Sequence, residues 1–213
     1  KMLYATFIDG YIPVNENDMI NTLKCYIKDN ICYLTEIMDV MRYSFDRIDF
    51  VERNSGLPYE NILNVYATYT RAQALALLDY WKTSSEGVTR IKEKKTTCLF
   101  ITLNKGNSFY SPSTAYHDYS INEELFHWQS QNATAPNTSV GQRYIHHEEQ
   151  KENILLFVRE QKDDKLGSVP FMFLGKGKFV SYQGSKPMNI VWKLENKIPA
   201  KFLEVTDKLG IEG

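Results

Sequence analysis

The sequence predicts an α+β protein in which a helical segment, residues 1–90, precedes a β-rich segment, residues 91–213. Two observations predict this class. Apolar residues recur at helical spacing through most of the first segment, and the second contains at least five β-branched and aromatic runs separated by turn residues. Such a series of short strands is typical of a curled antiparallel sheet or a barrel-like domain. We therefore expect a helical subdomain followed by a curled antiparallel β domain.

The composition is that of an ordinary globular protein, with 43% hydrophobic and 24% charged residues in 213. The sequence has neither a signal peptide nor a membrane-spanning run, so we expect a cytoplasmic location and no membrane partner. Charge is divided unevenly: residues 1–89 hold 8 basic and 12 acidic side chains, and residues 90–213 hold 17 basic and 14 acidic ones. A polyanionic partner would favour the second segment, although so small a charge does not establish one.

Helices are predicted where apolar residues follow a period near 3.6. "NENDMINTLKCYIKDN" begins at Asn15, a plausible N-cap, and "ICYLTEIMDVMRYSF" continues the pattern from residue 31. "YTRAQALALLDYW" is the clearest helix and is capped by Thr70. "YENILNVYA", residues 59–67, is predicted to be a short helix.

Strands are predicted in the second segment from β-branched and aromatic runs. They occupy residues 96–103, 125–131, 153–160 and 188–194. Residues 169–184 predict either a hairpin or one long bulged strand around Gly175 and Gly177.

Residues 116–131 combine aromatic rings with fixed polar groups, which is what a protein needs to hold a flat polar ligand. Asp118 stands beside Tyr116 and Tyr119. A carboxylate that accepts from an exocyclic amine, with rings on either side, is one way to hold an extruded base. The alternative is a turn aspartate beside core tyrosines.

Alternation along residues 125–131 sends Phe126, Trp128 and Ser130 to one face of the strand. The opposite face carries His127, Gln129 and Gln131. Amides can read base edges in bidentate geometry, or they can satisfy neighbouring backbone groups, and both interpretations stay open.

Two further segments carry charged residues. The polar loop of residues 132–143 contains Arg143, which could contact a phosphate or a base edge or form a surface ion pair, and residues 146–152, "HHEEQKE", predict a solvated charged loop rather than a metal site. Glu160 and Lys162 match half of a metal-dependent nuclease motif that Asp118 could complete, although an exposed hairpin turn is the stronger interpretation.

Several segments in order resemble one bacterial family: residues 102–131 ("TLNKGNSFYSPSTAYHDYSINEELFHWQSQ"), "GQRYIHH", "LLFVRE", residues 171–194 ("FMFLGKGKFVSYQGSKPMNIVWKL") and "IP". This family is an initially uncharacterised C-terminal domain of proteins that also carry a phospholipase-D-type nuclease and a DEAD/DEAH-box helicase. Its members resemble modification-dependent (type IV) restriction endonucleases, which attack DNA containing 5-methylcytosine or 5-hydroxymethylcytosine. The resemblance covers residues 65–200.

The resemblance implies a target-recognition domain that flips modified cytosine, with a barrel like that of SET-and-RING-associated (SRA) or PUA-like domains. It implies no catalytic residue, metal or cofactor in this chain; ATP, magnesium and the upstream nuclease and helicase domains belong to the parent protein. The residues that we expect to bind the modified base and duplex DNA are Tyr116, Asp118, Tyr119, Trp128, Gln129, Ser130, Gln131 and Arg143. Those expected to contact phosphates are Lys105, Lys176 and Lys178. Two alternatives stay open: a nuclease that uses Glu160 and Lys162, or a module that docks the helicase onto the nuclease.

Overall fold

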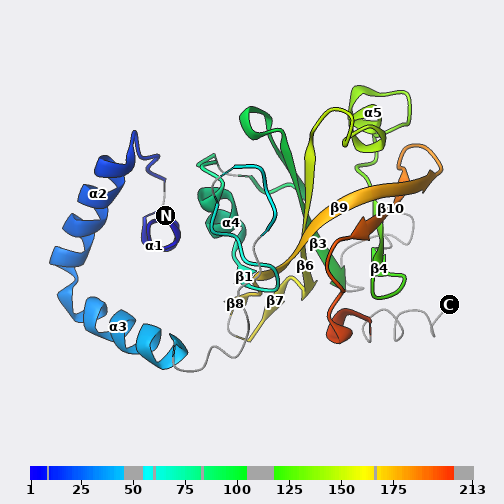
Figure 1. Ribbon diagram of the computed structural model, residues 1–213. Coiled ribbons are helices and arrows are strands. Elements are labelled where there is room, and N and C mark those ends of the chain that lie inside the picture. The colour runs from blue at the N-terminus through cyan, green and yellow to red at the C-terminus, as the bar shows by residue number, and fades with distance from the viewer. Residues whose placement is uncertain are drawn as a thin grey trace. The chain divides into compact units, whose positions relative to one another are not determined.

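The computed structural model describes residues 1–8, 10–45, 55–59, 61–82, 84–104, 118–165 and 167–203 (Figure 1). Contacts divide the chain into two compact units. The helical unit comprises Lys1–Arg53 and Ala72–Thr83, and the β-rich unit comprises Asn54–Arg71 and Ser84–Gly213. The division into two domains at residue 90 stays a prediction.

Local sequence explains the helices. Asn15 precedes α2 and its side chain accepts a hydrogen bond from Asp18 N at 2.9 Å, as an N-cap does. The predictions from "NENDMINTLKCYIKDN", "ICYLTEIMDVMRYSF" and "YTRAQALALLDYW" are confirmed, whereas the described part of residues 59–67 contains no helix. The helices of this part of the chain are α1 (Met2–Phe7), α2 (Glu16–Asp29), α3 (Ile31–Phe45) and α4 (Arg71–Leu77). In the part of the chain that the structure describes, none of the helices has the length and apolar character needed to span a membrane.

The β-rich unit is built on one large sheet and a small separate pair of strands. The strand order of the large sheet is β2-β3-β6-β9-β10-β5-β4, with β1 also paired to β9. The strands are β1 (Thr68–Tyr69), β2 (Val88–Ile91), β3 (Thr96–Asn104), β4 (Tyr119–Ser120), β5 (Leu125–Gln129), β6 (Asn153–Gln161), β7 (Asp163–Asp164), β8 (Gly167–Ser168), β9 (Phe171–Gln183) and β10 (Asn189–Leu194). A 3-10 turn, η1 (Lys92–Lys94), joins β2 to β3.

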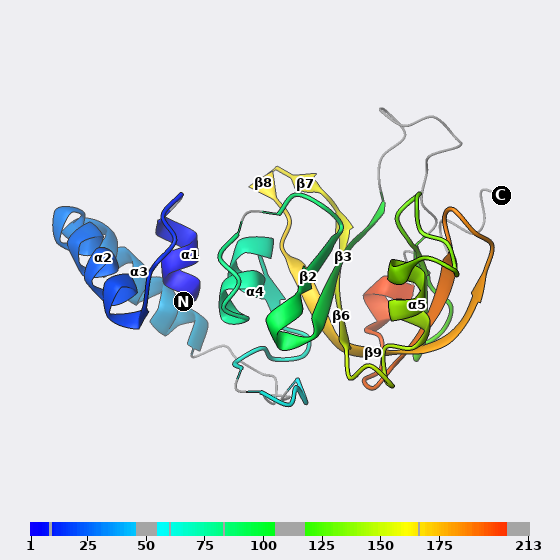
Figure 2. The same ribbon diagram turned by 90° about the horizontal axis from the view of Figure 1, so that it is seen from above.

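The long strand β9 gives the sheet its curl. Its partners β6 and β10 both show register shifts along it, and Gly175 beside one of these shifts has φ +98°, a conformation that favours glycine. Of the two predicted alternatives for residues 169–184, the bulged long strand is confirmed. β9 bends along its length in both views of the ribbon (Figures 1 and 2).

The α+β class with a curled, mostly antiparallel sheet is confirmed. The described strands form an open path that ends at β2 and β4 instead of closing into a barrel, and β3 and β6 pair in parallel. Parallel neighbours need a crossover, and the chain between these two strands supplies it with β4, β5 and α5 (Ser139–Ile145). α5 lies beside the β9 and β10 end of the sheet in both views (Figures 1 and 2).

Candidate nucleic-acid interface

The two faces of β5 differ as its alternation predicts. Phe126 and Trp128 are buried, whereas Leu125, His127 and Gln129 are partly exposed. The prediction of a core face and an outward polar face is therefore confirmed for residues 125–129, and it is wrong for Gln131, which lies beyond the end of β5 and accepts from Tyr144. The outward face is the one that a large ligand can approach.

Trp128 and Ser130 lie on the core side. The Trp128 ring is 5% exposed and packs edge-on against Tyr144 with ring centroids 5.3 Å apart. Ser130 is fully buried and its Oγ accepts a hydrogen bond from Met188 N at 2.9 Å. Contact of either side chain with an extruded base stays a prediction, and it would require this packing to open.

The outward side of the sheet carries a stacked pair of rings and a row of amides. Tyr119 of β4 pairs with His127 of β5, and their rings stack with centroids 4.5 Å apart and planes 16° apart. Gln129 donates through Nε2 to Asn189 Oδ1 at 3.1 Å, and Asn189 pairs in turn with Gln183 of β9. We call these five residues the outer polar surface. The strands β4, β5, β10 and β9 thus supply one stacked pair of rings and three amides to the same face of the sheet.

Tyr119 is 37% exposed, and Gln183 is exposed as well. Stacking on His127 holds the Tyr119 ring in place, because stacked rings prefer a defined offset geometry. Gln129 uses one amide hydrogen on Asn189, and the other groups of the two amides can serve a ligand. The surface can therefore offer a flat apolar face beside donors and acceptors.

Two of the expected site residues, Asp118 and Gln131, form hydrogen bonds within the protein. Asp118 is 6% exposed and its Oδ1 accepts from Gln129 N at 2.8 Å, so the carboxylate joins the start of β4 to the end of β5. Gln131 turns away from the amide row, and its Oε1 accepts from Tyr144 Oη at 3.1 Å. Tyr116 lies outside the described residues. The contact of Asp118 with a cytosine amine stays a prediction.

The lysines expected to contact phosphates are engaged with acidic or backbone groups where they are described. Lys176 and Lys178 both lie 3.7 Å from Glu195 Oε1, and Lys176 also donates to Gly56 O at 2.9 Å. Lys178 is the more exposed, at 53% of its side chain against 23%. A phosphate would have to compete with Glu195 for both, and this role stays a prediction; Lys105 lies outside the described residues.

The sequence patterns did not predict a buried ion-pair network centred on Glu152. Glu152 is 4% exposed and accepts two hydrogen bonds of 2.9 Å from Arg90 and one of 2.7 Å from Thr97. Arg143 Nε lies 3.9 Å from the same carboxylate. Burial acts to raise the pKa of Glu152, but the hydrogen bonds from Arg90 and Thr97 outweigh it and hold the pKa below its ordinary value.

His147 is the second buried residue of the segment that was predicted to be a solvated charged loop. It is 3% exposed, and Phe179 N donates to its Nε2 at 3.1 Å. Since Nε2 accepts, the proton of the neutral ring is on Nδ1, which lies 3.0 Å from Glu152 O. The prediction of a solvated loop is therefore wrong for His147 and Glu152, because both are drawn into the interior by partners that are distant in the sequence.

Burial lowers the pKa of His147, and the positive charge of Lys178 lowers it further. The hydrogen bond with the Glu152 backbone and the charges of Glu148 and Glu152 act in the opposite direction but do not outweigh burial. Below about pH 6.5, the ordinary pKa of histidine, the unfolded chain gains a proton that the folded chain does not yet bind. We expect the free energy of unfolding to decrease as the pH falls through this value. Urea denaturation of the wild type at about pH 7.5 and 5.5 measures the decrease, which His147→Gln should reduce.

The neighbouring His146, with a side chain 40% exposed, supplies the matched control. His146→Gln should retain the pH dependence of the wild type. An unchanged pH dependence in His147→Gln would show that this buried imidazole is not its source.

The nuclease alternative depends on Glu160 and Lys162, both of which are exposed near the end of β6. Arg159 donates to the backbone oxygen of Lys162 at 3.1 Å, which ties this turn together. Across the described ranges, no three His, Cys, Asp or Glu side chains form a group that could hold a metal ion. The absence of catalysis in this chain stays a prediction.

Comparison with solved structures finds three chains that resemble part of this one. The SUVH5 SRA domain in complex with methylated CHH DNA has a TM-score of 0.39 and 11% identity, and the match covers 71% of this chain and 99% of that chain. The same domain with fully methylated CG DNA has a TM-score of 0.38, 10% identity and the same coverage. Arabidopsis thaliana SUVH6 in complex with SAM has a TM-score of 0.39 and 14% identity, with 73% of this chain and 31% of that chain covered.

No curated protein matches this chain. A family model matches residues 63–205, an extent close to that of the resemblance in the sequence, and includes most of the β-rich unit. Because the match spans more than half of the sequence, the chain belongs to the family described as Domain of unknown function (DUF3427).

Proposed function

We propose that the β-rich unit binds duplex DNA and recognises 5-methylcytosine or 5-hydroxymethylcytosine as the target-recognition domain of a modification-dependent restriction endonuclease. The outer polar surface is the observation that carries the proposal. In this scheme the upstream nuclease and helicase domains of the same protein cut and move along DNA in the cytoplasm with ATP and magnesium. This chain supplies recognition and no catalysis.

The outer polar surface has the two kinds of group that bases require. A base can stack on the Tyr119 ring, which is exposed and held by His127. Glutamine and asparagine amides offer a donor and an acceptor in one plane, which is the geometry that reads base edges. Gln129, Asn189 and Gln183 place such groups on three neighbouring strands.

Recognition of the modification itself needs an additional apolar contact. Burying one methyl group contributes only about 1 kcal/mol, so a methyl preference requires a shaped pocket and not an open surface. Extrusion of the base would bring the methyl group into such a pocket, at a cost of a few kcal/mol for unstacking. Asp118, whose Oδ1 accepts from Gln129 N, is proposed to accept from the cytosine amine after extrusion.

Titration of the protein with three otherwise identical duplexes tests the proposal. The duplexes carry cytosine, 5-methylcytosine or 5-hydroxymethylcytosine at one position, and fluorescence anisotropy measures Kd with and without magnesium. We expect tighter binding to a modified duplex and no strand cleavage. Cleavage that depends on magnesium would favour the nuclease that uses Glu160 and Lys162, and the absence of any duplex binding would favour the docking module.

Replacing Tyr119 by alanine should weaken binding of the modified duplex by about ten- to a hundredfold, because stacking of a base on an aromatic ring is worth roughly 1–3 kcal/mol. Tyr119→Phe keeps the ring and should stay close to the wild type. Tyr33→Ala, at an exposed tyrosine of the helical unit, is the matched control. A folded Tyr119→Ala protein with the Kd of the wild type would exclude this ring from the interface.

A further inference from the structure

We propose that Arg90 and Arg143 together form a clamp for one phosphodiester group of duplex DNA, with Glu152 as the positioning residue that aligns them. This inference rests on the proposed binding of duplex DNA and adds a phosphate site made of other residues than the outer polar surface. Three observations carry it: the shared carboxylate, the excess of positive charge, and the position of both side chains at the boundary between core and solvent.

Both arginines approach the same oxygen of Glu152. Arg90 Nε donates to Oε1 at 2.9 Å while its Nη2 donates to Oε2 at 2.9 Å, and Arg143 Nε lies 3.9 Å from Oε1. Because the Nε atoms of Arg90 and Arg143 both lie within 3.9 Å of Glu152 Oε1, the two guanidinium groups are close to each other. Two planar forks held at this separation can engage the oxygens of one phosphate, a geometry that guanidinium groups favour.

Charge within the network is not balanced by Glu152 alone. One carboxylate faces two guanidinium groups, and its charge-assisted hydrogen bonds are directed to Arg90 and Thr97. Arg143 Nε is buried and has no hydrogen-bond partner among the described residues. The rest of the Arg143 guanidinium lies over the Tyr144 ring, with Cζ 5.4 Å from the ring centroid, and Nε lies 3.9 Å from Glu152. The positive charge is therefore only partly compensated, and a second anion beside Arg143 would stabilise it.

The accessibility of the two side chains suits a bound anion from outside. Arg143 has 12% of its side chain exposed and Arg90 has 35%, while that of Glu152 is only 2% exposed. The carboxylate is thus less accessible to solvent than either guanidinium group. Because folding has already fixed both side chains, binding a phosphate costs less side-chain entropy than it would at a free lysine.

The surroundings of the clamp are mixed in charge. Two turns, residues 92–95 and 148–152, meet where Asn153 N donates to Lys95 O at 2.7 Å. Their exposed basic side chains are Lys92, Lys95 and Lys151. Glu93 and Glu148 occupy the same two turns. The lysines can add long-range attraction for a duplex, but Glu93 and Glu148 offset part of it, so the clamp supplies the specific contact.

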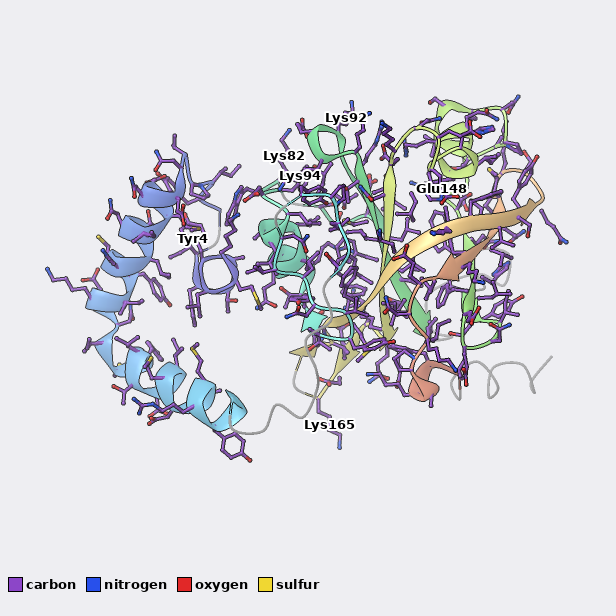
Figure 3. All side chains as sticks on the ribbon, viewed as in Figure 1. Tyr4, Lys82, Lys92, Lys94, Glu148 and Lys165 are labelled. Atoms are coloured by element: carbon purple, nitrogen blue, oxygen red, sulfur yellow. The ribbon has the colours of Figure 1, made fainter. Side chains whose placement is uncertain are left out.

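The β-rich unit also offers a matched control lysine. Figure 3 places Lys92 at one end of the sheet and the exposed Lys165, in the segment that joins β7 to β8, at the other. Lys165→Gln removes one positive charge far from the clamp. Arg143→Gln removes one charge from the clamp, and both variants keep a side chain of moderate length.

The test is a salt titration of binding to unmodified and modified duplexes between about 50 and 200 mM salt. Each phosphate contact contributes about 0.9 to the slope of log K against log salt, so Arg143→Gln should reduce the slope by about that amount. We expect it to weaken both duplexes several-fold, to leave their affinity ratio unchanged, and to differ from Lys165→Gln, which should match the wild type. A folded Arg143→Gln protein with the slope of the wild type would overturn the clamp but not the proposed function.

A second measurement uses the wild type alone, in case Arg143→Gln does not fold. Addition of duplex should shift the nuclear magnetic resonance of the Arg143 Nε–H group, and inorganic phosphate at the same concentration should not. No shift with duplex that is fully bound would overturn the clamp, whether or not inorganic phosphate shifts the resonance. If the clamp responds to duplex but the wild type ignores cytosine modification, the proposed function fails while the phosphate site stands.

Discussion

Replacing Glu152 by alanine should lower the free energy of unfolding by about 3–5 kcal/mol, because removing one partner of a buried ion pair leaves the other charge uncompensated. Glu152 accepts three hydrogen bonds from Arg90 and Thr97 and also faces Arg143. Alanine would leave two guanidinium groups beside each other and a buried threonine hydroxyl without its acceptor. Urea denaturation followed by circular dichroism measures the loss.

The control is Glu160→Ala, which removes an exposed carboxylate from the adjacent strand β6. Surface substitutions of this kind usually change the free energy of unfolding by no more than about 0.5 kcal/mol. Glu152→Gln, which keeps the shape and one acceptor but loses the charge, should lie between the two. A loss below about 1 kcal/mol in Glu152→Ala would contradict a central role for this carboxylate.

Replacing Trp128 by alanine in the otherwise unchanged protein should lower the free energy of unfolding by about 3–5 kcal/mol, as expected when a buried aromatic side chain is truncated. Trp128 packs against Tyr144 at 5.3 Å and near Trp192 at 6.3 Å, within the core formed by the sheet and α5. Thermal melting and urea denaturation both measure the effect. The cavity left behind adds to the loss of apolar burial.

This substitution also separates two roles for the same ring. If Trp128 is only a core residue, Trp128→Phe should restore most of the stability and the Kd for modified duplex should follow the folded fraction. A Trp128→Ala protein that melts like the wild type, but binds modified duplex ten- to a hundredfold more weakly, would instead make the ring a base-stacking group. That outcome would also show that the core can open around it.

Much of the architecture follows from patterns that lie within a few residues of each other. The cap at Asn15 predicts the start of α2, because the bond that satisfies the first turn is made by a residue three positions away. The alternation in residues 125–129 predicts which side of β5 is buried, because a strand directs successive side chains to opposite faces.

Short elements were harder to predict. α5 was not predicted within the polar residues 132–145, although Thr138 accepts from Gly141 N at 3.1 Å as a helix cap does. Seven residues are too few for a clear helical period, and the helix depends on Tyr144 reaching the core. β2 and the bridging strand β1 were missed for the same reason of length.

The candidate site divides in the same way. The sequence by itself determined the two classes of residue on β5, the outward direction of His127 and Gln129, and the family to which the chain belongs. Only the tertiary structure decided that Tyr119 stacks on His127, that Gln131 leaves the amide row, and that Glu152 is buried between two arginines. Arg90 and Glu152 are 62 positions apart, and their pairing depends on how β2, β3 and β6 associate. Local patterns record backbone geometry, whereas the burial of a charge depends on distant partners that only the folded chain brings together.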